Sequence, residues 1–188
     1  MWRTVFLATA ICLSALGLRA QQHNIDPKNS TITIHVGKTG MFSGLGHEHE
    51  ITAPIHIGTA EEGSHPSVEV RVNARELRVT GKDEPENDRP DVQKTMLGPE
   101  VLDSEHYQEI LFKSTATVPA GSGRWTVRGN LTLHGQTHPV TLDVTLKEGH
   151  YIGSAVMKLT DFGIKPPGKP GIRVKDEVRV DFDVRLAS

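Results

Sequence analysis

The stretch EVRVDFDVRL, residues 177–186, alternates apolar and charged side chains and decides how this chain folds. Successive side chains of a β-strand point to opposite faces, so a period of two predicts a strand with one apolar and one charged face. The same alternation recurs in residues 31–36 (TITIHV), 68–72 (VEVRV) and 140–146 (VTLDVTL). Several one-sided strands in one small chain predict a sheet that closes around its own apolar face.

The segments between these strands are rich in Gly, Pro, Asn and Asp, as turns are. The connections after residue 110 are short, which favours antiparallel neighbours because parallel neighbours need long crossovers. We therefore predict an all-β fold, an antiparallel barrel of about eight strands that is filled by side chains or holds one small ligand. The predicted strands are Ser30–Gly37, Glu50–Ile57, Ser67–Asn73, Ile110–Val118, Trp125–Leu133, Val140–Leu146, Tyr151–Leu159 and Glu177–Leu186.

Residues 90–104 break the strand pattern. Pro90 suits the first turn of a helix, Val92 and Met96 lie four residues apart, and Gly98 with Pro99 ends the helical pattern. One or two short helices are expected here, at one end of the barrel. Their apolar residues would either plug that end or act as a gate for a ligand.

The chain has 188 residues, a formal net charge of -2 and 5% aromatic residues. A chain of this length forms one ordinary domain once a leader is removed. The charge balance argues against nucleic acid or another polyanion as a partner, and the few aromatic residues provide no base-stacking platform.

The first twenty residues have a different composition from the rest. Arg3 gives a basic start, an apolar run extends from Val5 to Leu18, and the small residue Ala20 precedes polar residues. This pattern predicts that residues 1–20 are a signal peptide cleaved near Ala20, so that the protein is periplasmic or secreted. Cys12, the one cysteine, lies in this run, and a mature chain without it has no disulfide or thiolate chemistry.

Three later segments carry a family resemblance. Residues 101–115 contain Val-Leu-Asp, Tyr107, Glu-Ile and Phe-Lys-Ser-Thr; residues 127–142 read VRGNLTLHGQTHPVTL; and residues 159–164 read LTDFGI. Together, and in this order, they resemble the YceI-like family, also described as lipid-binding or polyisoprenoid-binding domains. The resemblance extends over residues 24–187.

The resemblance implies a lipocalin-like barrel whose interior binds an isoprenoid, quinone-like or other amphiphilic lipid. It implies no catalysis and no cofactor besides that lipid, and a transient membrane partner would load the ligand. The sequence also gives little support for an enzyme. It has no Gly-x-Ser-x-Gly motif of a hydrolase, and Asp161-Phe162-Gly163 is not accompanied by the glycine-rich phosphate loop that a kinase needs. The oligomeric state stays open.

The alternation also predicts which side chains would line such an interior, although a packed core would explain the same pattern. They share the apolar face of their strands and are Ile32, Ile34, Val36, Val68, Val70, Val72, Phe112, Leu131, Leu133, Val140, Leu142, Val144, Val178, Val180, Phe182 and Val184.

Three further features have a functional and a plain interpretation. His47 and His49, two residues apart, could chelate a metal in an alternative periplasmic metal-binding protein, but two ligands do not make a site. The basic side chains of residues 71–82 could meet a diphosphate head group or simply be solvated; they are Arg71, Arg75, Arg78 and Lys82. Trp125 and Tyr151 could line a pocket or pack in the barrel wall.

Overall fold

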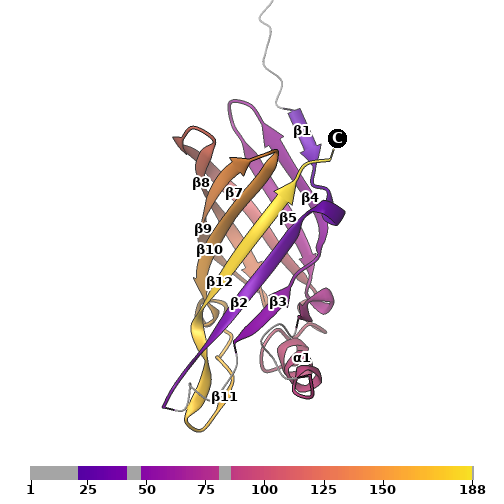
Figure 1. The fold of residues 1–188 in the computed structure, drawn as a ribbon, viewed down its shortest axis with the longest axis vertical. Helices are drawn as coiled ribbons and strands as arrows, with labels where there is room; N and C mark the ends of the chain where they lie inside the picture. Colours follow the sequence, from indigo (N-terminus) through magenta and orange to yellow (C-terminus); the bar gives the residue numbers. More distant parts are fainter. Residues whose placement is uncertain (1–20, 42–47, 81–85, 188) are drawn as a thin grey trace, which may run out of the picture.

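The computed structural model describes residues 21–41, 48–80 and 86–187, which form one curled antiparallel sheet with a helix at one end (Figure 1). The expected leader, residues 1–20, lies outside the described residues. The strands are β1 (Gln21–Asn24), β2 (Thr31–Thr39), β3 (His49–Thr52), β4 (Ile55–Glu62), β5 (Ser67–Asn73), β6 (Arg78–Val79), β7 (Glu109–Gly121), β8 (Arg124–Leu133), β9 (Gln136–Lys147), β10 (His150–Lys158), β11 (Gly168–Lys169) and β12 (Ile172–Arg185).

The hydrogen-bonded order of the strands is β1-β4-β5-β7-β8-β9-β10-β12-β2-β3-β6, with β11 paired to β12. β3 pairs with β2, whereas β4 pairs with β5, and only Ala53 and Pro54 separate β3 from β4. The Ala53 amide donates to the Ile32 carbonyl, which continues the β2 pairing up to the bend. β3 and β4 therefore act as one bent strand that closes the sheet into a barrel.

The all-β prediction is confirmed, and the predicted strand Ser67–Asn73 coincides with β5. The sheet has 12 strand segments rather than about eight. Part of the excess is short pieces, since β6 and β11 have 2 residues each. The rest comes from β1, which the sequence analysis did not predict, and from Pro54, which lacks an amide hydrogen and divides the predicted strand Glu50–Ile57.

β1 and the end of β12 meet at the end of the barrel opposite the helix. Ile25 bridges Leu186, the Asp26 amide donates to the Arg185 carbonyl, and the Ala187 amide donates to the Asn24 carbonyl. Figure 1 shows both segments at the upper end, together with the β4–β5 and β9–β10 hairpins. β1 pairs with the edge of β4 that does not pair with β5, so this edge is covered.

The helix α1 (Arg89–Leu97) confirms the helix expected within residues 90–104. A turn follows in which the Ser104 amide and hydroxyl both donate to the Leu97 carbonyl. Gln93 fixes the helix to the sheet, because its side chain accepts from the Val79 amide and donates to the Leu77 carbonyl. None of the helices among the described residues is long and apolar enough to cross a membrane.

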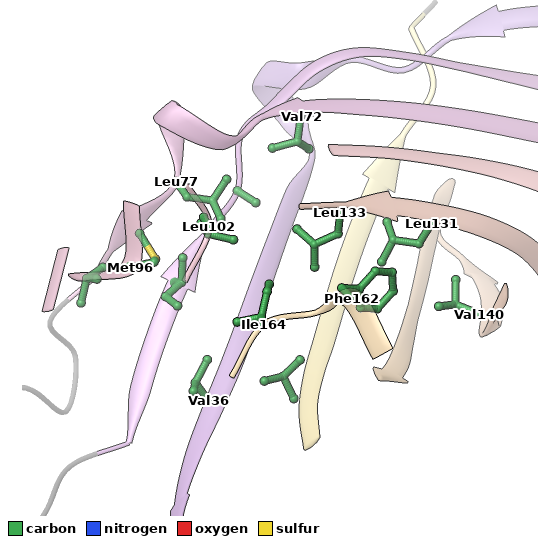
Figure 2. Packing of buried hydrophobic residues seen from close by; sticks show 14 residues of the cluster. Val36, Val72, Leu77, Met96, Leu102, Leu131, Leu133, Val140, Phe162 and Ile164 are labelled. Atoms are coloured by element: carbon green, nitrogen blue, oxygen red, sulfur yellow. The ribbon is translucent and has the colours of Figure 1, made fainter. Parts of the chain in front are cut away.

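The buried core lies at the α1 end of the barrel (Figure 2). The short 3-10 helices are η1 (Pro27–Asn29), η3 (Ala74–Glu76) and η4 (Leu159–Phe162). η4 places Phe162 among Leu131, Leu133 and Val140, and both Phe162 and Ile164 are only 1% exposed. Met96 and Leu102 pack beside Leu77 at the same end, so the plug predicted from these side chains is present.

Replacing Phe162 by Ala should lower the free energy of unfolding by about 3–5 kcal/mol, because the change leaves a cavity in the plug. Urea denaturation measures the loss. The control is Val156→Ala on the outer face of β10, where Val156 is 53% exposed. That control should change stability by less than about 0.5 kcal/mol. Equal losses for the two variants would show that Phe162 does not seal the barrel.

Candidate ligand-binding interior

The inner face of the barrel is built from cross-strand rows, because directly paired residues of antiparallel strands point to the same side. One row starts at buried Ile51 and crosses β2, β12, β10, β9 and β8; it contains Ile34, Val180, Ala155, Leu142 and Val127. The next row toward the β1 end contains Ile32, Phe182, Gly153, Val144 and Trp125. Both rows are apolar throughout.

On the other wall, a row joins Val70, Phe112 and Leu131. Val36 and Val178 pair near the closed end, and Val68 pairs with Ala60 near the other end. All sixteen side chains expected to line the interior therefore belong to the inner face. The barrel brings together on one surface residues from β2, β5, β7, β8, β9 and β12.

Exposure of these side chains follows a gradient along the barrel. Those that are buried are Val36, Val72, Leu131, Leu133, Val140, Val144 and Val178. Those that stay partly exposed are Ile32, Ile34, Val68, Val70, Phe112, Leu142, Val180, Phe182 and Val184. Ile32, Ile34, Val70 and Phe112 pack against the buried cluster at the plug. The other partly exposed side chains do not contact that cluster, and they are Val68, Leu142, Val180, Phe182 and Val184.

Two glycines of the inner face let aromatic rings lie against the barrel wall. A Cβ on Gly129 would come within 2.5 Å of the Phe112 ring, and one on Gly153 within 2.5 Å of the Phe182 ring. These contacts place each ring directly over a glycine backbone.

The closed end carries polar side chains that interact with one another. His134 Nδ1 lies 3.2 Å from the Phe162 carbonyl oxygen, and its ring meets Tyr107 edge-on at a centroid distance of 4.6 Å. His138 packs edge-on against Phe162 at 5.3 Å. Both histidines thus contact Phe162, the central residue of the plug.

At the open end, one hydrogen bond joins strands that are not neighbours in the sheet. The Tyr151 hydroxyl of β10 donates to Glu62 Oε1 of β4 over 2.5 Å, and the Tyr151 ring lies 6.1 Å from that of Trp125. Burial and the Glu62 carboxylate together raise the pKa of Tyr151 to about 12. Tyr151 and Trp125 therefore lie at the rim of the interior, and Tyr151 remains a neutral donor at physiological pH.

Sequence reasoning missed Glu62 because the predicted strand ended at Ile57, whereas β4 extends to Glu62, and because β4 contains an irregularity. The sheet register shifts between Ile55 and Ile57, so that Ile57 points outward and is 53% exposed. The shift moves Ala60 and Glu62 to the inner face. A β-bulge exchanges the side chains that point inward and outward along the rest of the strand, and the residue pattern of this segment does not predict one.

The described basic side chains of residues 71–78 have partners away from the inner face. Arg71 pairs with Glu69 at 2.9 Å and with Glu109 at 2.8 Å, while Arg75 and Arg78 donate to backbone carbonyls near the α1 end. The basic stretch therefore does not line the interior as far as it is described, and Lys82 lies outside the described residues. A shallow hollow over β9, β10, β12 and β2 includes Asp143, Asp181 and Asp183, which do not suit a hydrocarbon.

Nothing described supports the metal alternative. His49 begins β3, while His47 lies outside the described residues. Residues 21–41, 48–80 and 86–187 contain no group of three or more His, Cys, Asp or Glu side chains arranged to hold a metal ion.

These features define an antiparallel barrel whose apolar inner face is buried at the α1 end and partly exposed toward the β1 end. The model of the YceI-like domain matches residues 23–186, and the chain belongs to that family. The resemblance seen in the sequence is thereby confirmed.

The sequence of this chain is similar to those of known proteins. A UPF0312 protein of Vibrio cholerae is 30% identical over 112 residues, and one of Pseudomonas putida is 38% identical over 85 residues. These alignments cover 54% and 40% of this chain and 55% and 44% of the relatives, so the chain spans about half the length of these relatives.

Two solved structures share the fold. BcnA of Burkholderia cenocepacia has a TM-score of 0.59 at 18% identity, with 87% of this chain and 99% of that chain covered. A polyisoprenoid-binding domain of Saccharophagus degradans, described as implicated in plant cell wall breakdown, has a TM-score of 0.56 at 12% identity. The match covers 88% of this chain and 97% of that domain.

The rim geometry can be tested by titrating Tyr151. In a Tyr107→Phe background, Tyr151 is the one remaining tyrosine, and its absorbance should report a pKa of about 12. Adding Glu62→Gln should lower that pKa only part of the way toward about 10, because burial, the larger cause, remains when the carboxylate is removed. A far-ultraviolet dichroism spectrum at each pH checks folding. A Tyr151 pKa that does not respond to Glu62→Gln would contradict the contact.

Proposed function

We propose that the protein is an exported, non-enzymatic carrier that holds an isoprenoid, quinone-like or similar amphiphilic lipid inside its barrel. The observation that carries this proposal is the continuous apolar inner face, which is sealed by Phe162 at one end and partly exposed toward the other. Burying apolar surface is worth about 25 cal/mol per Å², so a long hydrocarbon needs few polar contacts to bind.

The comparisons support the ligand class. The Saccharophagus degradans domain, whose fold this chain shares, is described as a polyisoprenoid-binding domain. The inner face of this chain offers the same kind of surface, formed by aliphatic side chains such as Ile34, Leu142 and Val180. The export proposal is supported by the leader pattern of residues 1–20.

The path of the lipid follows from the asymmetry of the barrel. The plug end is packed with Phe162, Ile164 and Met96, whereas the β1 end has partly exposed apolar side chains such as Val68 and Val184. The hydrocarbon therefore enters at the β1 end and points its chain toward the plug. A membrane partner or the membrane surface would present the lipid at this end.

The first experiment identifies the ligand. Protein purified from its native envelope is measured by intact mass under native conditions and then extracted with organic solvent. A lipid of isoprenoid type in the extract, together with a polypeptide that begins near Gln21, is the expected result. Stoichiometric metal without lipid would favour the metal-binding alternative, and an intact Met1 would refute export.

A Leu142→Phe substitution tests whether the inner face holds the chain. Leu142 lies in the row between Val127 and Ala155, so a phenyl ring there should shorten the longest isoprenoid accepted. The matched control is Val156→Phe, which adds a similar ring on the outer face of the neighbouring strand.

A packed interior gives a different result for Leu142→Phe. Overpacking a filled core costs about 1–3 kcal/mol of stability, whereas an interior with room absorbs the ring. A folded variant with unchanged chain-length preference would show that Leu142 meets no ligand. A large loss of stability, without lipid in the native protein, would establish a packed core.

A further inference from the structure

The open end of the barrel carries a group of three polar side chains, which we name the rim triad: His23 of β1, Glu62 of β4 and Tyr151 of β10. Glu62 Oε1 accepts the Tyr151 hydroxyl hydrogen, and Glu62 Oε2 lies 3.7 Å from His23 Nε2. His23 Nε2 is itself buried and has no hydrogen-bond partner. A buried polar atom without a partner is costly, which makes it a candidate for contact with a ligand.

The rim triad belongs to the inner face. His23 pairs with Ala60, which pairs in turn with Val68, and Tyr151 pairs with Val184. The three side chains thus continue the apolar rows at the end where solvent reaches them. A lipid whose chain points toward the plug would place its head group among them.

Glu62 is the one formally charged side chain among the described residues of the inner face at this end. The basic residues of the strands at this end are Lys113, Arg124, Lys147 and Arg185, each of which alternates with an inner residue of its own strand and so points outward. Lys113 pairs with Glu69 at 3.3 Å, and Lys28 of η1 is exposed. An anionic head group would therefore meet the half-exposed Glu62 carboxylate, and like charges close together repel each other.

A hydroxyl head group fits the geometry of the triad. The Glu62 side chain is half exposed, so a lipid hydroxyl can donate its hydrogen to Glu62 Oε2 over about 2.8 Å. His23 Nε2 is covered in the structure, so the imidazole must turn toward that hydroxyl oxygen to donate to it. Tyr151 holds Glu62 in place by donating to its other oxygen and stays neutral because its pKa is raised to about 12.

We propose that the rim triad is a head-group site that selects an isoprenoid alcohol over the corresponding diphosphate. The proposal rests on the carrier function and deepens it. It replaces the basic stretch of residues 71–82 as the head-group contact, because Arg71, Arg75 and Arg78 interact elsewhere. It also assigns a role to Tyr151 other than packing in the barrel wall.

The test compares geranylgeraniol with geranylgeranyl diphosphate, two probes that share one hydrocarbon. Trp125 is the one tryptophan after residue 20 and lies beside Tyr151, so its fluorescence reports binding at the rim. The alcohol should bind at least about tenfold more tightly, since a hydrogen bond to a charged group is worth about 1.5–3 kcal/mol. In Glu62→Gln this preference should fall by about tenfold, by weaker binding of the alcohol and stronger binding of the diphosphate.

The matched control is Glu61→Gln. This substitution removes the same charge from the neighbouring position of β4. The Glu61 side chain faces outward and accepts a hydrogen bond from the Ser67 hydroxyl. The control should keep the preference of the unmodified protein, and dichroism spectra check that both variants are folded.

The outcomes separate the two proposals. If neither probe binds the unmodified protein, the carrier function fails, and the head-group site fails with it. If both probes bind with equal affinity, or the diphosphate binds more tightly, the head-group site is wrong while the carrier function stands. A preference that Glu61→Gln and Glu62→Gln alter equally would mean that it arises from net charge rather than from the triad.

Discussion

The backbone hydrogen bonds of one bent strand close the barrel, and the inner face exists only because they do. β3 pairs with β2, and after the bend at Ala53 and Pro54 the chain continues as β4 and pairs with β5. β5 and β6 follow the same bend, since β6 pairs with β3. Without this closure, the apolar rows of β2 and β12 would face solvent, and the edges of the sheet would offer unpaired donors and acceptors to other chains.

Closure also creates two ends, and the two ends are chemically different. At one end, η4, α1 and the turn after α1 form a plug that contains Phe162, Ile164 and Met96. At the other end only β1 and the last residues of β12 cross, and the side chains there include both apolar and polar groups. A barrel with one sealed and one accessible end imposes a direction on an amphiphile. In the complex that we propose, the hydrocarbon would lie inside and the head group would stay at the rim with Tyr151 and Glu62.

The sequence was informative wherever strict alternation held. It located β5 and the inner residues of β2, β9 and β12 because the period of two runs unbroken through them. It did not reveal Glu62, since the predicted strand ended at Ile57 and the bulge between Ile55 and Ile57 reverses the parity of β4. The same happens in β7, where a register shift between Ser114 and Ala116 turns Val118 outward, 46% exposed. Bulges depend on how two strands twist together, and that information is not local.

Methyl nuclear magnetic resonance of the protein during addition of geranylgeraniol tests most directly that the interior is the binding site. The account predicts shifts of the inner methyl groups of Leu142, Val144 and Val180, with intermolecular contacts to the isoprenoid chain. The outer methyl groups of Ile152 and Val156 lie on β10 between the same strands and should stay unchanged. Shifts confined to the outer groups, or no shifts at ligand excess, would contradict the account.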